Sequence, residues 1–151
     1  MVSAEISMCD TPESILSLDI VVPNQTRYLR LVGNMAELVA KELDDAKGDR
    51  DTLAYHLNLV LTEAMTNAIQ YNLSSGPNET VRICLSIEDK DLSVRVYDHG
   101  QGFDLGAVPT PDFTELNERG RGIFFIRSLM DSVEYRKLEC GNVLEMKKKF
   151  A

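Results

Sequence analysis

Two neighbouring stretches of the chain alternate apolar and polar residues, and this alternation limits the possible folds more than any other feature. Residues 81–87 carry Val, Ile, Leu and Ile at every second position, and residues 92–97 repeat the pattern with Leu, Val and Val. Successive side chains of a strand point to opposite faces, so a period of two predicts two half-buried strands. The polar residues 89–91 predict a hairpin turn between them. The apolar face of such a hairpin must be covered by other elements.

The residues before this hairpin predict the cover. Residues 16–22 alternate and end at Pro23, which predicts a further strand. From Thr26 to Gly48, and again from Asp49 or Asp51 to Tyr71, apolar residues recur at intervals of three and four, which predicts two amphipathic helices. The positions expected to be buried are Tyr28, Val32, Met35, Ala36, Val39 and Leu43 in the first helix, and Leu53, Leu57, Val60, Leu61, Ala64 and Ala68 in the second.

After the hairpin, residues 98–121 are rich in glycine, proline and charge and have no apolar period, which is typical of a long functional loop. Residues 122–130 then predict a helix, and residues 133–138 and 143–150 predict two strands around a turn at 140–142. This order favours an α/β (α+β) fold, a two-layer α/β sandwich with helices on one face of a mostly antiparallel sheet. Residues 1–14 lack periodicity and are expected to form a flexible N-terminal segment before one domain over 15–151.

Composition narrows the possible functions. A chain of 151 residues supplies one core. Its 24 acidic and 16 basic side chains give a net charge of -8, which argues against direct binding of nucleic acid. The acidic surface suits either a partner with a basic face or simple solubility. The three cysteines have no metal-binding spacing and are expected to be reduced, and no secretion signal or membrane-spanning run is found, so we expect a cytoplasmic protein without membrane association.

Three groups of polar residues are candidates for chemistry. Glu63 and Asn67 lie four apart on the second predicted helix, so they are neighbours on one edge of it. An amide oxygen is a hard, neutral ligand for Mg²⁺, and a nearby carboxylate can accept a proton from an attacking hydroxyl. Taken alone, this pair is more often an ordinary solvated helix face.

The second group, Asp98–Phe103, directly follows a predicted strand. Its two glycines allow a close approach to a ligand, and a carboxylate at a strand end can accept a hydrogen bond from an exocyclic amine such as that of adenine. The third group, Arg119–Gly122, opens a predicted helix, whose free N–H groups and positive dipole end favour an anion. By themselves these two groups are more often a plain turn and a solvated helix cap.

The order of the three groups is more informative than any one of them. The segments Glu63–Ala68, Asp98–Phe103 and Gly120–Ile123 resemble the N, G1 and G2 boxes of the GHKL ATPases, which share the Bergerat fold. Within this superfamily, the short single domain and the amino-acid sequence of residues 62–70 most resemble the bacterial serine-protein kinase anti-sigma factors. The resemblance runs from about residue 15 to residue 150 and includes residues 129–133.

The resemblance implies ATP and Mg²⁺ as cofactors. Asn67 would coordinate Mg²⁺, Asp98 would bind the adenine amine, and Glu63 matches the general base of the family. Arg119 or Arg121 would stabilise charge on the transferred γ-phosphoryl group, and both remain candidates. The other nucleotide-binding residues implied by the resemblance are Gly100, Gly102, Phe103, Gly120, Gly122 and Asn142, with Arg121 belonging to this set as well.

Two positions depart from the family pattern. Tyr71 stands where many relatives place a basic residue soon after the metal-binding Asn, and Asn142 stands where relatives often have Thr near the adenine pocket. Because Asn both donates and accepts hydrogen bonds, we expect altered contacts and not a lost site. His56 and His99 have no ligand spacing and are expected to be ordinary helix and loop residues.

The resemblance implies a serine/threonine protein kinase that acts as an anti-sigma factor. Such a protein would hold a sigma factor inactive, phosphorylate a small antagonist of the STAS type, and form a homodimer. An alternative is a non-catalytic, nucleotide-gated protein-binding module of the same fold. Glu63 argues against this alternative, because a pure binder has no need of a base. A histidine-kinase catalytic fragment ranks last, because no helical phosphoacceptor hairpin with a suitable His is found before the domain.

Overall fold

The computed structural model describes residues 16–42, 50–71, 79–100 and 121–149. Their elements, in chain order, are β1 (Leu16–Pro23), the 3-10 turn η2 (Thr26–Tyr28), α1 (Leu29–Lys41), α2 (Arg50–Tyr71), β2 (Thr80–Glu88), β3 (Asp91–Asp98), α3 (Arg121–Leu129), β4 (Ser132–Leu138) and β5 (Gly141–Lys149). The sequence predicted each strand and each α-helix in this order. The first helix begins with a 3-10 turn, which its apolar spacing did not reveal. The N-terminal segment expected over residues 1–14 lies outside the described residues.

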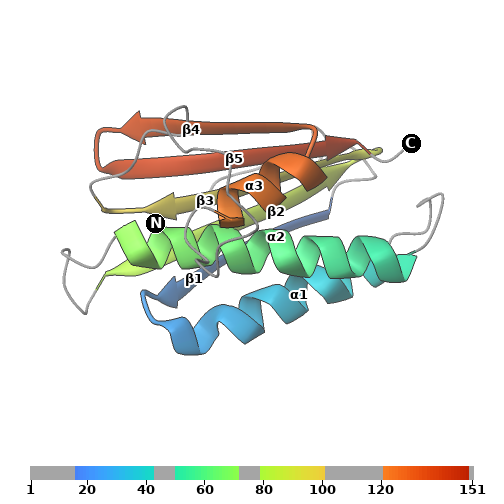
Figure 1. Ribbon diagram of the computed structural model, residues 1–151, viewed down its shortest axis with the longest axis horizontal. Coiled ribbons are helices and arrows are strands. Elements are labelled where there is room, and N and C mark those ends of the chain that lie inside the picture. The colour runs from blue at the N-terminus through green and yellow to red at the C-terminus, as the bar shows by residue number, and fades with distance from the viewer. Residues whose placement is uncertain (1–15, 43–49, 72–78, 101–120, 150–151) are drawn as a thin grey trace, which may run out of the picture.

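The strands form one sheet in the order β1-β2-β3-β5-β4, and every neighbouring pair is antiparallel. All three helices lie on one face of this sheet (Figure 1). The predicted fold class, a two-layer α/β sandwich with helices on one face of an antiparallel sheet, is therefore confirmed. The hairpin turn is tighter than expected, because Asp91 already belongs to β3. Asp89 in this turn has a positive φ of 55°, a conformation that Asp tolerates better than most residues.

The core lies between the sheet and the helices. On the sheet side, alternate residues of β2, β3 and β5 are buried, and they are Val81, Ile83, Leu85, Ile87, Leu92, Val94, Val96, Leu144 and Met146. α2 is the central helix, because it packs against α1, α3, β2 and β3. Its contacts on several sides also bury Met65 and Ile69, which the single helical stripe did not predict. Tyr28, Met35 and Leu53 are only half-buried.

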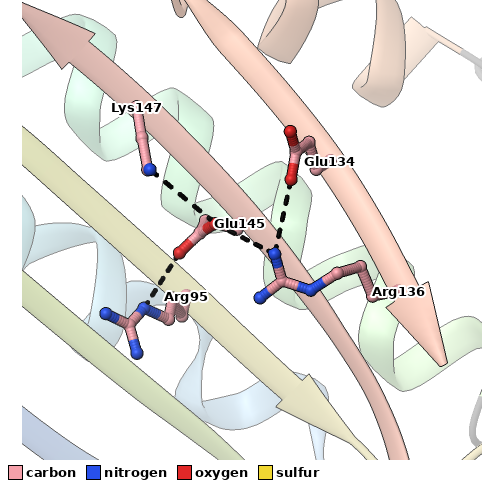
Figure 2. Close-up of polar contacts among 5 residues, drawn as sticks. All are labelled: Arg95, Glu134, Arg136, Glu145 and Lys147. Carbon is pink, nitrogen blue, oxygen red and sulfur yellow. Dashed lines mark hydrogen bonds and ion pairs between the residues drawn. The ribbon is translucent and has the colours of Figure 1, made fainter. Parts of the chain in front are cut away.

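The opposite face of the sheet carries a charged cluster centred on Glu145 of β5 (Figure 2). Arg95 Nε lies 3.1 Å from Glu145 Oε2, and Arg136 Nη1 lies 3.3 Å from Oε1. Arg136 also pairs with Glu134 at 3.3 Å, and Lys147 Nζ lies 4.0 Å from Glu145 Oε1. In each ion pair at least one of the two side chains is exposed to solvent, so a single pair adds little stability. Together the pairs connect side chains of β3, β5 and β4. This face is therefore polar, whereas the helix-facing side is apolar.

Within the part of the chain that the structure describes, no helix is long and apolar enough to cross a membrane.

Candidate functional site

The end of β3 holds a buried carboxylate. The antiparallel register places Asp98 opposite Asn142 of β5, and the two side chains are only 4% and 3% exposed. Asn142 Nδ2 donates one hydrogen bond to Asp98 Oδ1 and another to the Gly100 carbonyl oxygen, both at 2.9 Å. The Gly100 amide donates to the same Oδ1 at 2.9 Å. Among the described residues, both bonds to the carboxylate thus go to Oδ1, and the group is fixed in one orientation at the strand end.

A glycine turn keeps this arrangement in place. Gly141, the first residue of β5, has a φ of +137°, and a Cβ at this position would collide with the Asp98 carbonyl oxygen. The turn and the end of β3 can approach this closely only because residue 141 has no side chain. His99 Nδ1 lies 3.0 Å from the Cys140 carbonyl oxygen and adds a second link. His99 is thus a loop residue, as expected, that also contacts the turn between β4 and β5.

Asn67 lies near the end of α2 with its amide partly buried. Its Nδ2 atom is buried and has no hydrogen-bond partner among the described residues. A half turn of the amide exchanges its nitrogen and oxygen, so a hard oxygen ligand can occupy the same place. No group of three or more His, Cys, Asp or Glu side chains in the described ranges could hold a metal ion. The unpartnered amide of Asn67 fits a role as one oxygen ligand of Mg²⁺, an ion that usually takes its other ligands from water and phosphates.

Glu63, one turn before Asn67, reaches the start of α3. A Cβ built at Gly122 would lie 2.6 Å from Glu63 Oε2 and 3.5 Å from both Cβ and Cδ of Glu63. The carboxylate thus lies against the second residue of α3, where the first helical turn has N–H groups without partners inside the helix. α2 and α3 pack against each other, and α3 is anchored by Ile123 and Ile126, which are 4% and 0% exposed.

A polar network that the sequence did not reveal holds α2 against α1. A Cβ at Gly33 of α1 would lie 2.5 Å from Asn58 Oδ1 and 2.7 Å from Thr62 Oγ1. Thr62 donates to Asn58 Oδ1 at 3.2 Å, and Asn58 Nδ2 donates to Glu37 at 2.8 Å. The hydrogen bond from Asn58 is the main cause that holds the pKa of Glu37 below its usual value, with Lys41 contributing next. A glycine in the middle of a predicted helix was the available signal of this close helix crossing.

The predicted site residues thus fall into two groups with described contacts. Asp98, Gly100 and Asn142 meet at the end of β3, and Glu63 meets Gly122 where α2 and α3 cross. The end of α2, the end of β3 and the turn between β4 and β5 lie at the same end of the molecule, on the left in Figure 1. Gly102, Phe103, Arg119 and Gly120 lie outside the described residues, as does the side chain of Arg121.

The fold is that of the histidine kinase-like class of ATPase domains, and the comparisons with known proteins agree. The family described as histidine kinase-like ATPase domain matches residues 22–148. The chain belongs to this family, whose members have the GHKL-type fold. The resemblance to the GHKL ATPases that the sequence motifs indicated is therefore confirmed.

Three bacterial proteins are among the relatives of this chain. The chain is 32% identical to the anti-sigma F factor of Clostridium acetobutylicum over 117 residues, which cover 74% of this chain and 78% of the relative. It is 33% identical to the anti-sigma F factor of Heyndrickxia coagulans over 98 residues, covering 61% of this chain and 67% of the relative. It is 27% identical to the serine-protein kinase RsbW of Bacillus subtilis over 124 residues, covering 77% and 75%.

Solved structures show the same fold at low identity. The catalytic domain of histidine kinase ThkA is similar with a TM-score of 0.53 and 16% identity, covering 89% of this chain and 96% of that domain. The histidine kinase domain of the blue-light activated histidine kinase from Erythrobacter litoralis EL346 gives a TM-score of 0.51 and 19% identity, covering 85% of this chain and 62% of that one.

Proposed function

We propose that this chain is an ATP-dependent serine/threonine protein kinase that acts as an anti-sigma factor. It sequesters a sigma factor and phosphorylates a small antagonist protein of the STAS type. The observation that carries the kinase part is the position of Glu63, whose carboxylate lies on the first turn of α3 and one helical turn from Asn67. Support for the partner part comes from relatives that are named anti-sigma F factor and serine-protein kinase.

In this proposal the buried end of β3 recognises the adenine. Asn142 and the Gly100 amide hold Asp98 through Oδ1, and no described residue donates to Oδ2, so we assign Oδ2 as the acceptor for the exocyclic amine. The close approach of Gly141 to the backbone of Asp98 keeps this acceptor in place before the nucleotide binds. A pre-positioned acceptor avoids the cost of ordering a side chain on binding.

Asn67 and Glu63 serve the phosphate end. Asn67 offers its amide oxygen to Mg²⁺, which would neutralise charge on the phosphates of ATP. Glu63 accepts the proton of the attacking serine or threonine hydroxyl, so that the oxygen becomes a better nucleophile as it approaches phosphorus. The positive end of the α3 dipole favours negative charge near this point. Arg119 and Arg121 are the proposed partners of the transferred group.

Glu63→Gln separates a kinase from a nucleotide-gated binder. The amide cannot accept the proton, so phosphoryl transfer should fall about 100-fold or more, while ATP affinity stays close to that of the wild type. Asn67→Ala should weaken ATP binding as well as transfer, because it removes the metal ligand. Transfer is measured with γ-labelled ATP and a small partner that co-purifies with the chain, and ATP affinity is measured by calorimetry. Equal transfer by wild type and Glu63→Gln would contradict the assignment of the base.

Asp98→Asn tests the adenine contact separately. The substitution replaces an acceptor-only carboxylate with a group that also donates, and ATP binding should be lost in a protein that remains folded. Unchanged ATP affinity would remove the adenine assignment. If the wild type binds ATP and a partner but transfers no phosphate to any partner, the kinase proposal fails and the nucleotide-gated binding module replaces it.

A further inference from the structure

The contact between Glu63 and Gly122 joins two segments that are far apart in the sequence. Gly122 is buried, and the space that its Cβ would fill is occupied by the Glu63 carboxylate, with Oε2 at 2.6 Å from the built Cβ position. A side-chain carbon and a non-bonded oxygen do not approach this closely in proteins, because even weak C–H···O contacts are longer. A side chain at residue 122 and the observed position of the Glu63 carboxylate therefore exclude each other.

The atom that would have to move is the end of a flexible side chain. The only one of the three nearest atoms that lies too close to an alanine Cβ at residue 122 is Glu63 Oε2 at 2.6 Å, whereas Cβ and Cδ of Glu63 lie at an ordinary 3.5 Å. The fold can accommodate the methyl group by rotating Glu63 away from α3. The expected consequence is a displaced carboxylate in an intact protein.

We propose that Gly122 is a positioning residue for Glu63: the missing side chain provides a seat on the first turn of α3 that holds the base carboxylate in place. The positive end of the helix, whose first N–H groups have no partner inside the helix, favours a carboxylate in this seat. Ile123 and Ile126 hold α3 in the core, and α2 packs against it, so the seat keeps a fixed position relative to the helix that carries Glu63. The catalytic part of this inference rests on the proposed kinase function, but the seat itself does not.

The seat is tested first by thermal unfolding of Gly122→Ala in two backgrounds. In Glu63→Ala no carboxylate is present, so alanine should raise the melting temperature by about 2–4 °C through its better helix propensity. With Glu63 present, this gain should be absent or reversed, because the carboxylate loses its seat. Ser128→Ala, on the exposed side of α3, is the control and should shift the melting temperature equally in both backgrounds. An equal shift by Gly122→Ala in both backgrounds would overturn the seat.

The positioning role is tested by phosphoryl transfer and calorimetry on the same variants. Gly122→Ala should lower kcat about 10-fold or more, and Glu63→Gln combined with Gly122→Ala should be no slower than Glu63→Gln alone. Loss of ATP affinity with unchanged kcat would overturn the positioning role and make Gly122 a nucleotide contact. If the wild type transfers no phosphate, the kinase proposal fails, and the unfolding measurements still decide whether the seat exists.

Discussion

The substitution Asn142→Ala should both destabilise the protein and weaken the binding of ATP. It removes the donor of two hydrogen bonds of 2.9 Å, one to the Asp98 carboxylate and one to the Gly100 carbonyl oxygen. A hydrogen bond to a charged group contributes about 1.5–3 kcal/mol and a neutral one about 0.5–1.5 kcal/mol, so the loss should be about 2–4 kcal/mol. For a chain of this size, this corresponds to a fall of roughly 5–15 °C in the melting temperature.

The effect on ATP follows from the same bonds. Without Asn142 the carboxylate keeps only the Gly100 amide as a described donor, so its second oxygen is less well oriented toward the adenine amine. A loss of about 1.4 kcal/mol there weakens ATP binding about tenfold, which calorimetry on the folded variant can measure. Asn34→Ala, on the exposed side of α1, is the matched control and should change neither property.

A double-mutant cycle with Asp98→Asn shows whether the reasoning is correct. Because Asp98 and Asn142 are in direct contact, the effects of the two substitutions on the free energy of unfolding should be non-additive by about 0.5–3 kcal/mol. Additive effects within about 0.5 kcal/mol would refute the buried pair as the source of the stability. A stable Asn142→Ala protein with wild-type ATP affinity would refute the positioning of Asp98 by Asn142.

Two further predictions concern other parts of the molecule. Gly33→Ala should destabilise the protein by about 1–3 kcal/mol in denaturant unfolding, because the methyl group would displace the side chains of Asn58 and Thr62. A stabilised variant would contradict this and show that the helix propensity of alanine dominates. Cys84 should react with iodoacetamide more slowly than exposed Cys140 at a pH of about 8, because burial raises the pKa of the Cys84 thiol and so lowers its thiolate fraction. The two rates are compared by peptide mass spectrometry, and equal rates would contradict this prediction.

The sheet could be predicted from the sequence because its apolar face is a strict alternation. A shift of one residue in β2 or β3 would turn every apolar side chain to the polar side, so the pattern of residues 81–97 permits only one orientation of the hairpin. The helices were equally clear from their apolar spacing. The burial of Met65 and Ile69 was not, because a single stripe describes a helix with one covered face, and α2 is covered by the sheet and by two helices.

The candidate site was predictable as a set of residue types, but its contacts were not. The pairing of Asp98 with Asn142 depends on the β3–β5 register, which joins residues 44 positions apart and which local periodicity does not determine. For the same reason, the substitution of Asn for the usual Thr suggested altered contacts without identifying the partner. The register shows that the altered residue supports the carboxylate directly.

The glycines show most clearly what a pattern of residues leaves open. In the sequence Gly122 was one of the glycines that the resemblance placed at the nucleotide, and Gly141 was a turn residue. In the fold each has a distinct role, because a Cβ at Gly141 would collide with the backbone of Asp98, whereas the atom that a Cβ at Gly122 would approach too closely is the carboxylate oxygen of Glu63. Substitution of Gly141 should therefore strain the fold, and substitution of Gly122 should mainly move the proposed base. The two ends of the site thus depend on glycine for different reasons, one for folding and one for the placement of a carboxylate.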